Sequence, residues 1–214
     1  QESQHRGRTR ICLRQLWRHR SECSFDLAAY TGDMTTIHIY PNPTYPAARA
    51  EYNDKSYPAV VGKSGVVPAD TKKEGDKATP DGEYGILGGY YRSDAIEKPV
   101  AQIELQPISP DDIWVNDQAD PRYNSLAKAA DASDASHEKL YRDDHLYNIV
   151  LDLDYNRTPA VPGKGSAIFV HVARDQNVPA NTPTDGCIAF READLLEILR
   201  SLPQDGKISI HSTE

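Results

Sequence analysis

GSAIFVHVA, residues 165–173, is an almost unbroken apolar run in which His171 is the single titratable side chain. Runs of this length, rich in β-branched and aromatic residues, are typical of strands that are buried on both faces. We therefore predict that 165–173 forms a central strand of a sheet. LYNIVLDLDYN, residues 146–156, has the same character and predicts a second strong strand.

The segments around these two runs predict a mainly β domain. Apolar and polar residues alternate in 35–40 and 100–108, which favours strands with one solvated face, and 57–67 reads as two short strands around a glycine turn. Residues 117–137 are polar and alanine-rich, so we expect a long surface excursion, of the kind that often covers a site. The one persuasive helix is 191–202, whose leucines and isoleucine share a face.

Length and composition bound the class of protein. The chain has 214 residues, 38% hydrophobic and 26% charged, which suits one globular domain with its own core. No apolar run approaches the roughly 18 residues of a membrane span, so we expect none. The net charge of -8 argues against a nucleic-acid partner, because phosphate binding requires a basic face.

Residues 1–33 differ in kind from the rest of the chain, since they contain six arginines and no lysine. They lack the continuous apolar stretch and the small-residue cleavage site of a secretory signal. Met34 is the only methionine and directly precedes a predicted strand. Two interpretations stay open: 1–33 is non-native sequence ahead of a start at Met34, or it is a disordered basic arm. In both, the domain spans 34–214.

The cysteines are Cys12, Cys23 and Cys187, with no CxxC pair and no zinc-finger spacing. This arrangement predicts no structural metal site. The first two could pair in an oxidising compartment, which leaves Cys187 as a free thiol.

Cys187 follows a Thr-Asp-Gly turn, sixteen residues after His171. A cysteine nucleophile reacts as its thiolate, and a neighbouring imidazole can take the thiol proton and later deliver it to a leaving group. A glycine turn can also point backbone amides at an oxyanion. The alternative is that both residues are ordinary core side chains, since free cysteines and strand histidines are often buried. Spacing alone favours that alternative.

A second cluster of potential ligands lies at His137, Asp143, Asp144 and His145. Without further ligands at fixed spacing, a solvated charged loop is the preferred interpretation, and we expect no metal there.

The segment 171–190 resembles the signature of the L,D-transpeptidase (YkuD-like) family, in which a strand histidine and a spacer precede Ser/Thr-x-Gly-Cys and an aliphatic residue. Residues 75–86 are similar to the Thr-Pro-x-Gly-aromatic segment of that family, and 137–156 to its Glu-x-Leu…Tyr…Tyr-Asn strand. Three motifs in the family's order, over about 60–211, are fairly specific to this family, and the departures described below resemble those of a divergent, single-domain subfamily found in Proteobacteria. The matching signature positions are His171, Thr184, Asp185, Gly186, Cys187 and Ile188.

This resemblance implies a β-sandwich of two mixed sheets over 34–214, with a C-terminal helix and short surface helices, and no metal or organic cofactor. It implies a peptidoglycan L,D-transpeptidase of the periplasm or cell envelope, which joins donor and acceptor stem peptides by 3–3 or 1–3 cross-links. Carbapenems are then candidate inhibitors. Two alternatives remain: an L,D-carboxypeptidase or endopeptidase with the same dyad, and a non-catalytic cell-wall-binding module.

The resemblance also implies roles for individual residues. Cys187 attacks the carbonyl of the L-centre and forms a thioester, which the amine of a second stem resolves. His171 acts first as base and then as acid, oriented by a backbone carbonyl such as that of Val172. Amides of Gly186 and Cys187 form the oxyanion hole, within the turn that Thr184 and Asp185 begin.

The chain departs from the family signature at several positions. Asp185 stands where a histidine is usual, Ala189 where an arginine is usual, and Val172 where a glycine often follows the histidine. The spacer after the histidine is also a few residues short. The candidates for replacing the arginine or contacting the substrate are Arg142, Arg191, Arg92 and Tyr91.

Overall fold

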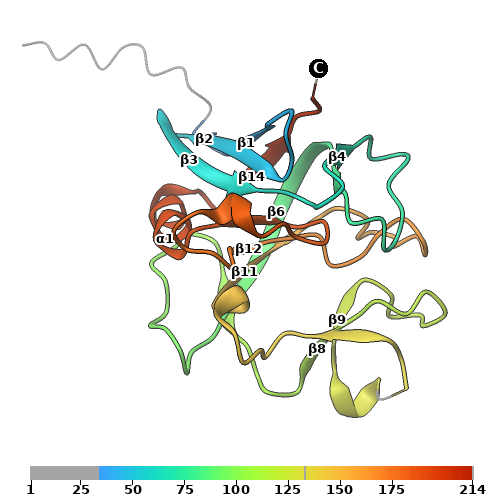
Figure 1. Ribbon diagram of the computed structural model, residues 1–214. Helices are drawn as coiled ribbons and strands as arrows, with labels where there is room; N and C mark the ends of the chain where they lie inside the picture. Colours follow the sequence, from blue (N-terminus) through green and yellow to red (C-terminus); the bar gives the residue numbers. More distant parts are fainter. Residues whose placement is uncertain (1–33, 133, 214) are drawn as a thin grey trace, which may run out of the picture. The chain divides into compact units, whose positions relative to one another are not determined.

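The computed structural model describes residues 34–132 and 134–213, so the predicted tail at 1–33 lies outside the described residues (Figure 1). A sheet of nine strands dominates the described part, in the order β11-β12-β13-β3-β2-β1-β14-β6-β7. Its strands are β1 (Thr36–Pro41), β2 (Ala47–Tyr52), β3 (Lys55–Val60), β6 (Gly82–Tyr91), β7 (Leu105–Pro107), β11 (Ile149–Leu153), β12 (Phe169–Val172), β13 (Ile188–Phe190) and β14 (Lys207–Ile210).

This sheet closes on itself because β6 pairs with β14 through its first four residues and with β11 through the rest. A register shift between Asp152 and Leu153 interrupts the β11–β6 ladder, and irregularities of this kind let a strand bend. The mainly β class is confirmed, but the predicted sandwich of two mixed sheets is corrected to one closed, barrel-like mixed sheet. Alternation along the chain identifies strands, whereas the pairing that closes the sheet joins residues about sixty positions apart.

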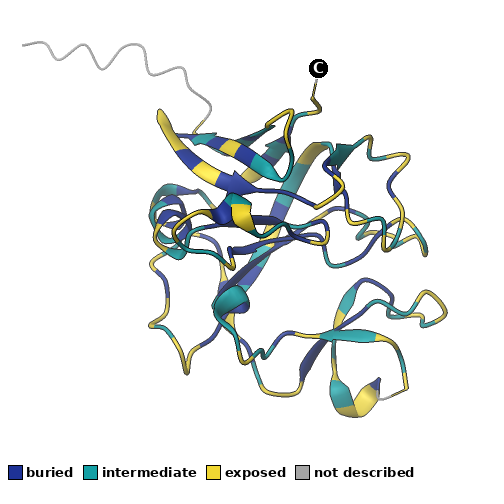
Figure 2. Cartoon of the chain, in the orientation of Figure 1, coloured by how far each residue is buried: buried dark blue, intermediate teal, exposed yellow. Residues whose placement is uncertain are grey.

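The interior of the closed sheet is one apolar core. Successive side chains of a strand point to opposite faces, so Val170 and Val172 of β12 enter this core while Phe169 and His171 point outward. Strands on the far side contribute Ile37 and Ile39. Figure 2 shows β11 and β12 in the dark blue of buried residues.

A three-stranded sheet faces the outer side of β11 and β12, and its strands are β8 (Asp112–Val115), β9 (Ser125–Lys128) and β10 (His137–Lys139) (Figure 1). Trp114 of β8 is fully buried and packs edge-to-face on Phe169, with ring centroids 4.8 Å apart. Both faces of β12 are therefore covered, which explains its nearly continuous apolar sequence. The region expected to be an irregular excursion, 117–137, instead supplies β9 and the start of β10.

The helix predicted at 191–202 is confirmed as α1 (Glu192–Ser201), which buries Leu195, Ile198 and Leu199. No helix in the described ranges has the length and apolarity needed to cross a membrane. The remaining elements are β4 (Val66–Val67), β5 (Thr79–Pro80) and 3-10 turns at Ala129–Asp131, His145–Tyr147 and Pro179–Asn181.

Candidate active site

His171 and Cys187 lie on the same outer face of two neighbouring parallel strands. The register of β12 and β13 pairs His171 with Ala189, and Cys187 precedes Ala189 by two positions, so its side chain shares that face. A rise of about 3.3 Å per residue and a strand spacing of about 4.8 Å put the two Cα atoms about 8 Å apart, within reach of facing side chains. Both residues line one pocket of about 540 Å³.

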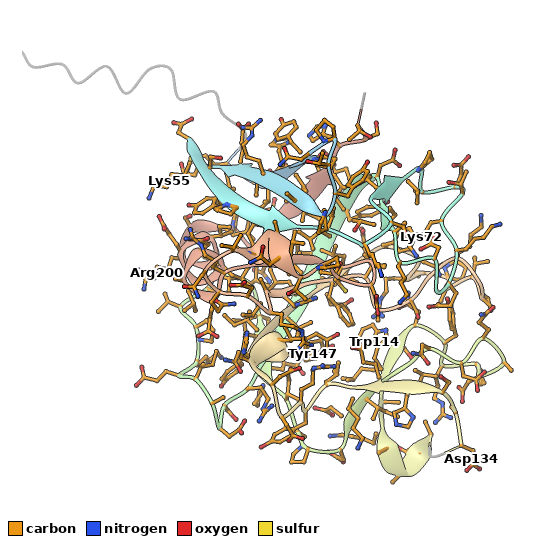
Figure 3. All side chains as sticks on the ribbon, viewed as in Figure 1. Lys55, Lys72, Trp114, Asp134, Tyr147 and Arg200 are labelled. Carbon is orange, nitrogen blue, oxygen red and sulfur yellow. The ribbon has the colours of Figure 1, made fainter. Side chains whose placement is uncertain are left out.

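Several separate parts of the chain line this pocket. The outer face of β12 and β13 forms the floor, the loop at 72–77 forms one side, and the small sheet contributes Glu138. The segments at 142–147 and 182–185 also line the pocket. Figure 3 labels two of the lining side chains, Lys72 and Tyr147, which come from different walls.

The Cys187 thiol is held by the strand beside it. Its Sγ donates to the carbonyl oxygen of Ala167 at 3.1 Å and accepts from the amide of Phe169 at 3.4 Å. Burial raises the pKa of this thiol to about 12, the Phe169 amide opposes that rise, and the carboxylate of Glu138 adds to it. At neutral pH the resting residue is therefore a thiol, not a thiolate.

The His171 ring is fixed in one orientation. Its Nδ1 lies 2.9 Å from the carbonyl oxygen of Val172, so the tautomer that donates this hydrogen bond leaves Nε2 as an acceptor. The edge of the Tyr147 ring packs against it, with centroids 5.4 Å apart. Burial lowers the pKa of His171 to about 4; the hydrogen bond to Val172 opposes this shift and the nearby Arg142 guanidinium contributes to it. A neutral imidazole beside a neutral thiol suits proton transfer during attack rather than a resting ion pair.

Hydrogen bonds join the cysteine turn to the Thr-Pro segment at 79–80. The hydroxyl of Thr79 donates to the Gly186 carbonyl at 2.8 Å and accepts from the Gly62 amide at 2.9 Å. Within the turn, the hydroxyl of Thr184 donates to the carbonyl of Cys187 at 2.6 Å. Two motifs that lie about a hundred residues apart in the sequence therefore form one rigid unit that positions the thiol.

The turn uses some of its polar groups internally. The Gly186 amide donates to Thr184 Oγ1 at 3.2 Å, so its predicted place in an oxyanion hole requires that bond to break. The amide of Cys187 is the remaining candidate of the predicted pair. Asp185 extends into solvent with 82% of its side chain exposed and pairs with Lys77 at 3.5 Å.

Of the arginines proposed from the sequence, Arg142 lines the pocket. Its Nε and Nη2 donate to the two oxygens of Asp144 at 2.8 and 2.9 Å, and its guanidinium lies 5.1 Å from the centroid of the Tyr147 ring. Most of its positive charge is therefore already balanced by a carboxylate.

Arg191, Arg92 and Tyr91 are absent from the described residues that line the pocket. Arg191 pairs with Asp194 at the start of α1, at 2.5 Å. Arg92 pairs with Asp94 at 2.7 Å, and Tyr91 is buried in the interior core. The structure therefore brings none of these three side chains together with Cys187 and His171 in the lining of this pocket.

Sequence reasoning assigned no role in the site to several side chains of the pocket, among them Lys72, Glu138, Tyr147 and Arg174. Glu138 and Tyr147 belong to the segment at 137–156 that resembles a family motif. The motif could therefore have pointed to them, but the sequence did not show that this segment lines the pocket. Arg174 lies just beyond the end of β12, three residues after His171, and forms an ion pair with Asp144. Lys72 is buried and forms an ion pair with Asp76. Neither cation has a sequence signature of its own.

The potential metal ligands in the segment 137–145 are not grouped around a common point in the described structure. His137 Nδ1 contacts the carbonyl of Ala135 at 2.7 Å, and His145 Nε2 contacts that of Ala173 at 3.0 Å. Asp144 is engaged with Arg142. Across the described ranges, no three His, Cys, Asp or Glu side chains are grouped so that they could hold a metal ion.

The described part of the chain thus combines a closed β-sheet with a free cysteine in a pocket. The sequence matches the family model described as the L,D-transpeptidase catalytic domain, YkuD, over residues 44–210. The chain belongs to this family of cysteine-dependent enzymes that modify peptidoglycan. A comparison with curated proteins gave no match.

Gly186→Ala is expected to destabilise the protein by about 1–3 kcal/mol. The added Cβ would collide with backbone atoms, and alanine is strained at the positive φ of this position. Gly186 has φ of +139°, and a Cβ there would lie 2.9 Å from the carbonyl oxygen of Ala78. Gly75→Ala is the matched control, since Gly75 also has positive φ, +75°, but a Cβ at this position would have no neighbouring atom within 4 Å. Urea denaturation of both variants measures the difference, and equal losses would show that crowding at Gly186 is unimportant.

Proposed function

We propose that this protein is a peptidoglycan L,D-transpeptidase in which Cys187 carries the donor stem peptide as a thioester. The observation that carries this is the shared face of β12 and β13, on which His171 and Cys187 line one pocket. Peptidoglycan lies outside the cytoplasm, so we also place the working protein in the cell envelope. The family match supports the chemistry at the level of cysteine-dependent peptidoglycan modification.

In the donor half-reaction, Cys187 Sγ attacks the carbonyl of the L-centre while His171 Nε2 takes the thiol proton. The carbonyl oxygen becomes an oxyanion that the Cys187 amide stabilises. Collapse of this intermediate breaks the peptide bond and leaves the thioester. The departing amine receives the proton from His171, which returns to its neutral form.

In the acceptor half-reaction, an amine of a second stem attacks the thioester. His171 accepts a proton from the attacking nitrogen and passes it to Sγ as the carbon–sulfur bond breaks. The product is a new amide, a 3–3 or 1–3 cross-link, and the free thiol. Water competes for the same thioester, so the acceptor must be held in position for transfer to exceed hydrolysis.

Cationic side chains at the rim suit a ligand that carries carboxylates. The side chain of Arg174 is 53% exposed, and its one ion pair with a described residue is a long one to Asp144 at 3.5 Å, so most of its charge is available. Ala189, at the position of the family's arginine, lines the same pocket as Arg174. We propose that Arg174 contacts the donor stem in place of that missing arginine.

Incubation with purified muropeptides, followed by mass spectrometry, tests the proposed function. A transpeptidase is expected to yield dimers whose mass equals two stems less the leaving group. Trimmed monomers or cleaved dimers without new dimers would instead identify an L,D-carboxypeptidase or endopeptidase. Retention of muropeptides with unchanged masses and no Cys187 adduct would indicate a non-catalytic binding module.

A further inference from the structure

Glu138 is a carboxylate in the wall of the pocket that holds Cys187 and His171. It lies on β10, paired in register with Trp114, and 31% of its side chain is exposed. The hydroxyl of Tyr147 donates to Glu138 Oε1 at 2.5 Å. Because the Tyr147 ring also packs on His171, Glu138 is held at a fixed position beside the dyad.

The charge of Glu138 is only partly matched by a cation. Its one ion pair within the described ranges is with Arg142, at 3.6 Å, which exceeds hydrogen-bond distance. Arg142 directs two donors to Asp144 instead. A partly desolvated carboxylate with only a neutral hydroxyl as its hydrogen-bond partner favours the arrival of a positive group.

This negative charge opposes the donor half-reaction. The Glu138 carboxylate adds to the rise in the pKa of the Cys187 thiol, because a thiolate beside a carboxylate is disfavoured. Negative charge also develops on the carbonyl oxygen during attack. Glu138 therefore hinders the donor half-reaction. If it has a role in catalysis, that role lies in the acceptor half-reaction.

We infer that Glu138 binds the ammonium group of the acceptor stem peptide beside the thioester, an assignment that rests on the proposed function. An acceptor amine is an alkylammonium at neutral pH and must both approach Cys187 and lose a proton before it can attack. A fixed carboxylate between the small sheet and Tyr147 does both, by attracting the cation and by accepting its proton.

The protons balance over this step. The acceptor ammonium gives one proton to the Glu138 carboxylate and becomes a neutral amine. During attack, the nitrogen gives a second proton to His171, which delivers it to Cys187 Sγ as the thioester breaks. Glu138 then releases its proton to solvent. Burial raises the pKa of Glu138, which makes its carboxylate a better proton acceptor than an exposed one.

Glu138→Gln keeps the size of the side chain and a carbonyl acceptor for Tyr147 but removes the charge. The ratio of cross-linked to hydrolysed product, at limiting acceptor, is expected to fall about 10- to 100-fold, the range for loss of one charged hydrogen bond. Acylation of Cys187 by donor alone, followed by intact mass, is expected to stay equal or become faster. A merely structural role would slow both steps.

Two controls isolate the charge. Glu192→Gln, on α1 and outside the described pocket lining, also loses a carboxylate that accepts one neutral hydrogen bond, from Asn148 at 2.8 Å, and should leave the ratio unchanged. Hydroxylamine, largely uncharged at neutral pH, is the second acceptor. Hydroxamate formation by Glu138→Gln should match that of the unmodified protein, even where transfer to the stem amine is lost.

The outcomes separate the inference from the proposed function. Normal acylation with an unchanged product ratio in Glu138→Gln would overturn the role of Glu138 and leave the transpeptidase proposal standing. Equal losses with hydroxylamine and with the stem amine would also overturn it. Absence of Cys187 acylation in the unmodified protein would overturn the proposed function itself.

Discussion

Cys187→Ala is expected to lower the rate of cross-link formation at least about 10⁴-fold, because Cys187 is the one thiol among the described residues of the pocket. The sulfur is the atom that becomes covalently bound, so its loss removes the pathway rather than weakening one contact. The measurement is dimer formation from muropeptides by mass spectrometry. Intact mass after incubation with a carbapenem provides a second readout, since a covalent adduct should form on the unmodified protein alone.

The fold should survive this substitution. Cys187 is one of the partly buried residues packed on the outer cluster around Trp114 and Phe169, and alanine removes only its sulfur. Thermal unfolding of the variant provides the control for folding. Cross-linking or a covalent adduct that persists in a folded Cys187→Ala protein would exclude Cys187 as the nucleophile.

His171→Asn is expected to lower the rate of Cys187 acylation about 10²- to 10⁴-fold, the usual contribution of a general base. The thiol has a pKa of about 12, so very little thiolate forms at neutral pH without a base beside it. Asparagine fits the space but cannot carry the proton. His38→Asn, on β1, is the control for replacing a histidine elsewhere. Unchanged acylation in His171→Asn would show that another group takes the thiol proton.

The pH dependence of the unmodified protein tests the same role. A base must be unprotonated to act, and burial lowers the pKa of His171 from its usual value to about 4. Acylation should therefore stay nearly constant from neutral pH down to about pH 5 and decline tenfold per unit below about pH 4. An acid limb centred near 6.5 would contradict a buried, neutral His171.

Unfolding must be monitored in the same pH range. The unfolded chain binds a proton on His171 near pH 6.5, while the folded protein does so only near pH 4, so the contribution of this residue to stability falls as pH drops between those values. Initial rates should be taken at pH values where circular dichroism shows a folded protein. A rate that follows the loss of folded signal would not report on the base.

Local sequence was sufficient for the strongest strands and for the helix, but not for the strand at 125–128. The apolar run at 165–173 predicted β12, and the leucine face at 191–202 predicted α1, because burial on one or both faces leaves a short-range period in the sequence. His171 and Cys187 have a chemistry that their neighbours lack, but it was the resemblance to the family signature that selected them as a dyad. The turn motif and its order relative to the two other motifs indicated the family.

Tertiary structure alone decided how these parts meet. Closure of the sheet depends on β6 pairing with both β14 and β11, and no local pattern encodes the partner of a strand. The place of Glu138 beside Tyr147, and of Arg191 away from the pocket, follows from the packing of the small sheet and of α1. Shifted pKa values arise in the same way, because desolvation depends on the atoms that surround a group, which come from distant parts of the chain.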